Sequence, residues 1–105
     1  MVIAIRNATG IDLHLAILAG KKSIRFRVTL APPVLEEDGH AERLRHGEGF
    51  GMTGCPDGIR VKVDSSGTGM AIRAVKRRSV IDGVDQDGFP DGEETYLELT
   101  LRLMN

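Results

Sequence analysis

The stretch TYLELTLRL, residues 95–103, decides the fold of this chain. Leu97, Leu99, Leu101 and Leu103 recur at every second position, with polar residues between them. Successive side chains of a β-strand point to opposite faces, so this spacing places all four leucines on one face. An α-helix would scatter them over two faces. The stretch therefore predicts a strand with one buried and one solvent-exposed face.

The same alternation recurs earlier in the chain. It is present in residues 11–18, 24–30 and 59–63, and a shorter apolar run covers residues 2–6. Turn sequences such as NATG and PDG separate these segments. Short strands at close spacing predict an all-β fold, a single-domain β-sandwich or flattened barrel of about six to eight mostly antiparallel strands.

One segment fits two secondary structures. Residues 70–80, MAIRAVKRRSV, form a strand if Ile72 and Ala74 face inward. They form a helix if Ile72, Val75 and Ser79 face inward. We favour the strand because the neighbouring segments have the alternation of strands.

A long loop is expected in the middle of the chain. Pro32 and Pro33 end the third strand and open a loop that runs to about Phe50. Within it we expect a short helix at Ala41–Arg45, and we expect an irregular loop or bulge at GEGFGMTG, residues 47–54. Long loops often carry function, so this loop is one surface where we expect a partner to bind.

Length and composition restrict the class of protein. The chain has 105 residues, which suits one domain over residues 1–105, and 41% of them are hydrophobic. The net charge of -1 gives no general attraction to nucleic acid or to anionic membranes. Cys55 is the single cysteine, so no internal disulfide forms. No signal peptide is recognisable, and we expect a cytoplasmic protein or an excised domain of an exported one.

An acidic segment near the end of the chain raises the sharpest functional question. Seven acidic residues lie between Asp82 and Glu98, with no lysine or arginine among them. In GVDQDGFPDGEE, residues 83–94, carboxylates recur at the alternating positions from which loops coordinate Ca²⁺, and a glycine at the sixth position permits a sharp bend. The candidate ligands are Asp85, Asp87, Asp91 and Glu94 through carboxylates, Phe89 through its carbonyl oxygen, and Asp82 as an additional carboxylate.

This stretch of about twelve residues resembles the calcium loops of bacterial thrombospondin-type-3-like repeats, which are related to EF-hand loops. Those loops often read D-x-D-x-D-G-[LF]-P-D-G-x-E. Gly83 stands where the repeats have their first aspartate, and a strand-like segment follows in place of an exit helix. The resemblance implies a local calcium site and not the fold of that family. The other interpretation is a solvated hairpin turn, because Asp-Gly and Pro-Asp-Gly are common turn sequences.

Two further clusters have weaker functional interpretations. Arg73, Lys76, Arg77 and Arg78 either contact phosphate or pair with the acidic residues that follow. The chain has no tryptophan, one tyrosine and three phenylalanines. Few rings are therefore present to stack on bases, and we expect no nucleic-acid partner.

A region with soft metal ligands is the second cluster. His40, His46, Met52 and Cys55 carry groups that suit copper. No histidine follows Cys55, whereas copper-binding β-sandwiches of the cupredoxin kind place a ligand histidine after the cysteine. Surface histidines and a buried or half-buried thiol are the favoured interpretation.

These observations predict a non-catalytic binding or interaction module with a protein or glycan partner and a calcium-braced loop. No nucleophile with a recognisable base and no phosphate-binding glycine loop is found, so we expect no enzyme activity. One alternative is a structural or assembly subunit, including a homo-oligomer, that pairs through edge strands such as Tyr96–Leu103. Another is a small lipid- or membrane-binding β protein, which the small net charge and scarce aromatic residues disfavour.

Overall fold

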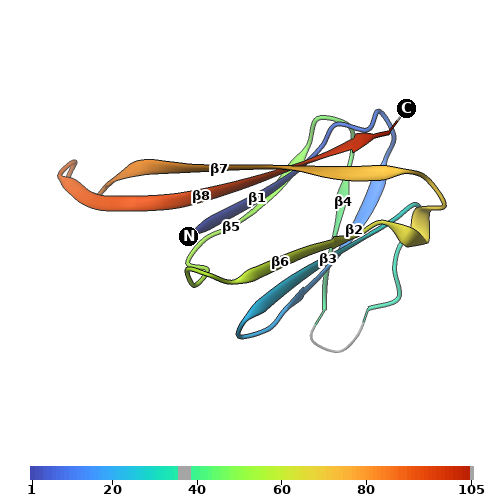
Figure 1. The fold of residues 1–105 in the computed structure, drawn as a ribbon, viewed down its shortest axis with the longest axis horizontal. Coiled ribbons are helices and arrows are strands. Elements are labelled where there is room, and N and C mark those ends of the chain that lie inside the picture. The colour runs from blue at the N-terminus through green and yellow to red at the C-terminus, as the bar shows by residue number, and fades with distance from the viewer. Residues whose placement is uncertain (36–38, 105) are drawn as a thin grey trace.

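The computed structural model describes residues 1–35 and 39–104 and shows two four-stranded sheets packed face to face (Figure 1). The first sheet has the order β5-β1-β8-β7 and the second β4-β2-β3-β6. The strands of the first are β1 Val2–Asn7, β5 Gly49–Met52, β7 Ile72–Val84 and β8 Pro90–Leu103. Those of the second are β2 Leu13–Ala19, β3 Ser23–Thr29, β4 His40–Leu44 and β6 Arg60–Asp64. A turn of 3₁₀ helix, η1 at Ser66–Thr68, links β6 to β7.

The core lies between the sheets and consists of the inward residues of each alternating segment. Leu97, Leu99 and Leu101 of β8 are each at most 4% exposed. They belong to one buried apolar cluster with Ile3, Ile5, Leu13, Leu15, Ile17, Ile24, Phe26, Val28, Leu44, Cys55 and Ile72. Burying such a side chain contributes about 1.5–3 kcal/mol, so this cluster is the main stabilising feature of the fold. The predicted β-sandwich is confirmed, and so is the strand predicted within residues 70–80.

The sheets are mixed. Four of the six strand pairings are antiparallel, as expected for most of them, and β1–β8 and β3–β6 are parallel. In the parallel pair of the first sheet, Val2 lies opposite Tyr96 and Asn7 opposite Leu101. The first and last strands of the chain are therefore neighbours at the centre of one sheet.

The helix predicted at Ala41–Arg45 is wrong, because the chain forms β4 there. β4 pairs antiparallel with β2, and Leu44 lies opposite Leu13 with both side chains buried. Alanine, glutamate, arginine and leucine favour a helix in isolation. This preference is weak, and pairing across the sheet overrides it.

The irregular loop or bulge predicted at residues 47–54 is also wrong in part, since it contains the strand β5. β5 pairs antiparallel with β1. A Cβ atom on Gly49 would lie 3.1 Å from the carbonyl oxygen of Ile5, so glycine permits the close approach of the two backbones. The loop predicted over Pro32–Phe50 is interrupted by β4 and by the start of β5, and its residues 36–38 lie outside the described residues.

The terminal segment Tyr96–Leu103 is not an edge of the sheet, contrary to expectation. β8 lies between β1 and β7, and the strands at the two edges of its sheet are β5 and β7. Its leucines are buried because strands on both sides and the second sheet cover them. The open backbone edges of the first sheet are therefore those of β5, of β7 and of the part of β8 that extends beyond β1, residues 90–95.

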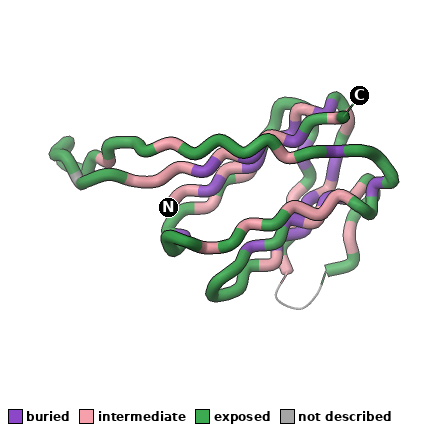
Figure 2. The backbone as a smooth tube through the Cα atoms, viewed as in Figure 1, coloured by how far each residue is buried: buried purple, intermediate pink, exposed green. Residues whose placement is uncertain are grey.

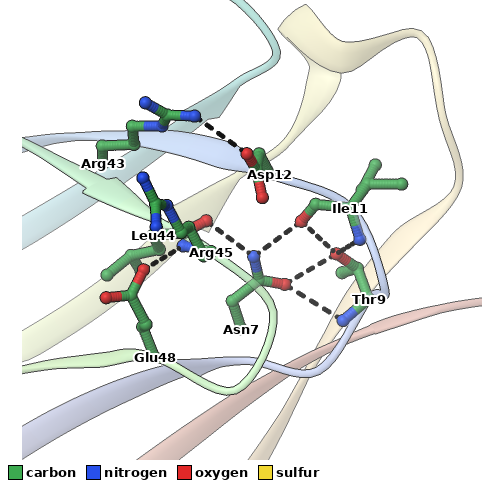
Figure 3. Close-up of polar contacts among 8 residues, drawn as sticks. All are labelled: Asn7, Thr9, Ile11, Asp12, Arg43, Leu44, Arg45 and Glu48. Carbon is green, nitrogen blue, oxygen red and sulfur yellow. Dashed lines mark hydrogen bonds and ion pairs between the residues drawn. The ribbon is translucent and has the colours of Figure 1, made fainter.

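Asn7 joins the two sheets where the chain leaves β1 (Figure 3). Its Nδ2 donates to the carbonyl oxygens of Ile11 at 2.8 Å and Leu44 at 2.9 Å. Its Oδ1 accepts from the backbone N–H of Thr9 at 3.0 Å and from the Thr9 hydroxyl at 2.6 Å. Asn7 is fully buried, and its amide uses both donors and two acceptor positions. One side chain thus fixes the corner at which the first sheet passes into the second.

Candidate functional site

The hairpin of β7 and β8 extends beyond the rest of its sheet. Its pairing runs from Ile72 opposite Leu103 to Val84 opposite Pro90, whereas β1 pairs with β8 only from Tyr96 onward. We call residues 79–95 the hairpin arm. Figure 1 shows this arm projecting as a two-stranded ribbon past both sheets. The radius of gyration is 14.7 Å, above the roughly 13 Å of a compact domain of this length, which the arm explains.

Asp85 shapes the tip of the hairpin arm. Its backbone N–H donates to the carbonyl oxygen of Phe89 at 2.8 Å, and its carbonyl oxygen accepts from Gly88 at 3.0 Å. Its side-chain Oδ1 accepts from the N–H groups of Asp87 and Phe89, both at 2.9 Å. Gly88 has φ 86°, which a side chain would strain. The tip is a tight hairpin loop that the Asp85 carboxylate holds in shape.

A bulge twists the hairpin arm next to its tip. Asp82 lies opposite Glu93 and Val84 opposite Pro90, so the register shifts between these pairs. The extra residue belongs to β8, where Gly92 has φ 86°. β7 keeps regular strand geometry over its full 13 residues.

Most of the hairpin arm is exposed (Figure 2), and its apolar residues share this exposure. Val80 is 60% exposed, Ile81 46%, Val84 64% and Phe89 67%. The second sheet does not cover this part of β7, so alternation there buries nothing. Exposed apolar groups gathered on one protruding element are typical of a surface that contacts another macromolecule.

Charge changes sign along β7. Arg73, Lys76, Arg77 and Arg78 lie in its first half, and all four are exposed. Asp82 lies in the second half, followed by Asp85 and Asp87 at the tip, and these are exposed as well. β7 is an edge strand, and no strand in the described part of the chain pairs with its outer side. The basic cluster and the first three acidic residues of the acidic segment thus follow one another along the open edge of β7 and its tip.

The predicted calcium ligands are divided between the tip and the two strands. Asp85, Asp87 and Phe89 lie at the tip, with one carboxylate oxygen of Asp85 already accepting two backbone N–H groups. Asp91 begins β8, and its side chain lies outside the described part of the structure. The chain does not wrap around a central point, as a calcium loop does, but opens into two paired strands.

The two remaining candidates lie further from the tip and on opposite faces. Asp82 is opposite Glu93, whereas Glu94 is opposite Ile81 and shares its face of the ribbon. Asp85 follows Ile81 by four positions, about 13 Å along the chain. Glu94 lies instead 3.8 Å from the nitrogen of Met1. Among the described side chains, no group of three or more His, Cys, Asp or Glu is placed to hold a metal ion, and calcium binding stays a prediction.

The residues considered for copper have separate partners. His40 lies 2.6 Å from a carboxylate oxygen of Glu42, and its ring is 5.8 Å from that of Phe50. Nδ1 of His46 accepts from the N–H of Gly10 at 3.0 Å. Cys55 is buried in the core. These contacts agree with the interpretation of surface histidines and a buried thiol.

A surface hollow lies between the turn that joins β2 to β3 and the segment before β6. It is lined by Lys21, Lys22, Ser23, Pro56, Asp57, Gly58, Ile59 and Arg60. The backbone N–H of Arg60 donates to the carbonyl oxygen of Lys22 at 2.9 Å and closes its floor. The hollow is shallow and open, and Asp57 lies among the basic residues Lys21, Lys22 and Arg60. We therefore consider it a weaker candidate for a functional site than the hairpin arm.

Comparison with protein-family models, with curated proteins and with solved structures finds no match to this chain. In the described part of the chain, no helix is long and apolar enough to cross a membrane.

The projection of the hairpin arm is the feature that sequence reasoning missed. The signal was the run from Ser79 to Val84, in which the apolar residues Val80 and Ile81 are adjacent and no longer alternate. Adjacent apolar residues on a strand point to opposite faces and cannot both enter one core. This break marks the point at which β7 leaves the sandwich.

Proposed function

We propose that this chain is a non-catalytic protein-interaction module and that the hairpin arm is its contact element. This proposal rests on one observation: the ribbon that projects from the sandwich exposes the apolar residues Val80, Ile81, Val84 and Phe89. Side chains of this kind supply binding free energy when a partner removes them from water. The sandwich acts as the rigid base that presents the ribbon.

A protein partner is favoured over a glycan. The hairpin arm offers an open strand edge, and a strand of another protein can pair with such an edge through backbone hydrogen bonds. Phe89 is the only aromatic residue of the tip and is 67% exposed, which suits an anchor that enters a pocket of the partner.

Site-specific photo-crosslinking in the cells that produce the chain tests this proposal. A photoreactive amino acid replaces Phe89 or Val84 in two variants, and Lys21 in a control variant, since Lys21 is exposed on a distant turn. We expect protein adducts from positions 84 and 89 and none from position 21. Adducts at equal yield from all three positions, or from none, would contradict the proposal. Competition by excess unlabelled chain separates a saturable contact from random collision.

A further inference from the structure

The open edge of β7 has the chemistry of a strand that pairs with a copy of itself. Two copies of one strand can pair antiparallel about a twofold axis perpendicular to the sheet, which brings the first half of each beside the second half of the other. The first half of β7 is basic and the second half, with the tip, is acidic. The antiparallel arrangement therefore brings opposite charges together on both sides of the axis.

The charges also select the register. An axis at Ser79 sets Lys76 opposite Asp82 of the second copy, and an axis at Val80 sets Arg78 opposite that Asp82. An axis at Arg77 or Arg78 would place arginine directly against arginine. Like charges at such positions are destabilising, so of these four registers the ones centred on Ser79 and Val80 are favoured.

Apolar residues fall at the centre of the favoured registers. Val80 and Ile81 lie next to the axis, 60% and 46% exposed in the single chain, and both would lose part of this exposed surface on pairing. The charged residues lie further out on each side. An apolar centre with a polar rim is the usual arrangement of a protein interface.

The shape of the hairpin arm permits this contact. Ser79 and Val80 lie where β7 has passed the start of β1, so the axis falls at the base of the projecting ribbon. Two ribbons that meet there antiparallel carry their sandwiches toward opposite ends. The bulge belongs to β8, which leaves the backbone of β7 regular for pairing.

We propose that the hairpin arm binds a second copy of this chain through antiparallel β7–β7 pairing centred on Ser79 or Val80, which joins the two four-stranded sheets into one continuous sheet. This inference rests on the proposed role of the hairpin arm as a contact element and names its partner. The backbone edge supplies hydrogen bonds, and the charge pattern supplies the register and excludes most unrelated strands.

Charge reversal with complementation tests the pairing. One variant carries Lys76→Glu and Arg78→Glu, and a second carries Asp82→Lys. Sedimentation velocity over a concentration series gives the mass of each, and circular dichroism confirms that each is folded. Lys21→Glu with Lys22→Glu is the matched control, because it makes the same charge change at an exposed distant turn.

We expect the parent chain and the control to approach twice the chain mass of 11.4 kDa as concentration rises. Each reversed variant alone should self-associate at least about tenfold more weakly, since like charges then meet at both symmetric positions. An equimolar mixture of the two variants should regain the dimer, because acid again meets base at every pair. Added salt should weaken the self-association of the parent chain, because it screens the attraction between opposite charges.

A cysteine pair gives a second measurement that does not depend on charge. Directly opposite strand residues have Cα atoms about 4.5–5.5 Å apart, within reach of a disulfide. Ser79→Cys or Val80→Cys should therefore form a covalent dimer under mild oxidation, and Val75→Cys should not. The unsubstituted chain controls for Cys55, which is buried.

A parent chain that stays monomeric at every concentration overturns the proposal, and so does a dimer that all charge variants form equally. Failure of the mixture to dimerise overturns it as well. These outcomes are separate from the proposed function. Photo-crosslinks from Phe89 and Val84 to a different protein, with a monomeric parent chain, would keep the interaction module and reject the second copy as its partner.

Discussion

At the scale of single residues, Asn7 holds the corner between the sheets with four hydrogen bonds in a fully buried site. A buried carbonyl that loses its donor keeps the cost of having left water. Removing the Asn7 amide would leave the carbonyl oxygens of Ile11 and Leu44 without that donor, and the N–H and hydroxyl of Thr9 without their acceptor.

We therefore expect Asn7→Ala to lower the free energy of unfolding by about 2–4 kcal/mol. Urea unfolding followed by circular dichroism measures this change. Thr9→Ser is the matched control, because it keeps the hydroxyl that donates to Asn7, and it should cost less than about 1 kcal/mol. Equal losses in both variants would show that the corner depends on packing and not on the Asn7 hydrogen bonds.

Asp64, at the end of β6, is the residue through which stability should respond to acid. Hydrogen bonds from the hydroxyl and the N–H of Ser66, at 2.7 and 3.0 Å, hold the pKa of Asp64 at about 2, below its ordinary value of 3.8, and Arg25 at 3.3 Å adds to this. Because the pKa of Asp64 is lower in the folded state than in the unfolded state, Asp64 stabilises the fold at pH values above its pKa in the unfolded state. That contribution is lost as the pH falls from about 4 toward 2.

We expect Asp64→Asn to flatten the decline of the unfolding midpoint between about pH 4 and pH 2 relative to the parent chain. Thermal unfolding at closely spaced pH values provides the measurement. Asp57→Asn is a suitable control, since Asp57 is an exposed carboxylate on a separate turn. If the unfolding midpoints of Asp64→Asn and the parent chain fell equally with pH, protonation of Asp64 would not be coupled to unfolding.

At the scale of elements, the geometry of the β7–β8 hairpin bears on the two interpretations of the acidic segment. The tip conformation uses one oxygen of Asp85 for two backbone N–H groups and carries Glu94 about 13 Å along the ribbon. A Ca²⁺ ion that needs six to eight oxygens would have to reopen part of this ribbon. The cost of reopening would reduce its affinity.

We accordingly expect millimolar Ca²⁺ to leave the unfolding midpoint of the metal-stripped protein unchanged. Differential scanning calorimetry with and without Ca²⁺ tests this for the parent chain and for Asp87→Ala. A rise of the midpoint in the parent that disappears in Asp87→Ala would instead support the calcium loop that the sequence resemblance predicts. A rise in both would indicate a site elsewhere.

The sequence predicts some elements better than others for a physical reason. β8 and β3 were evident because a buried face imposes strict alternation on them. β4 and β5 were missed because short edge strands bury little, so His40–Leu44 keeps helix-forming residues and Gly49–Met52 keeps glycines. The parallel neighbours β1 and β8 could not be predicted either, since register between distant segments leaves no local pattern.

At the scale of the whole molecule, the hairpin arm contributes no residue to the buried core of the sandwich. The buried cluster includes Ile72, Leu97, Leu99 and Leu101, which lie outside the arm, and no residue between Val80 and Thr95 belongs to it. The sequence showed the acidic segment and the basic cluster as two candidate sites. Only the pairing of β7 with β8 shows that they form one surface.

Replacing residues 80–95 by Asn-Gly, which suits a two-residue hairpin turn between Ser79 and Tyr96, should leave the sandwich folded. We expect the free energy of unfolding to change by less than about 1 kcal/mol, since no core residue is lost. Chemical denaturation measures this, and sedimentation of the same variant should show a monomer. A shortened chain that no longer unfolds cooperatively would mean that the arm supports the sandwich.

The central position of β8 has a consequence for the order in which the protein folds. The parallel neighbour of β1 is synthesised about ninety residues after it, from Tyr96 to Leu101. Until that segment appears, Ile3 and Ile5 have only β5 beside them, and the sheet lacks its three central leucines. Contacts between such distant segments make folding slow, on the order of milliseconds to seconds. A nascent or truncated chain that ends before residue 96 would therefore expose the apolar faces of its strands. Such a chain would be a substrate for chaperones.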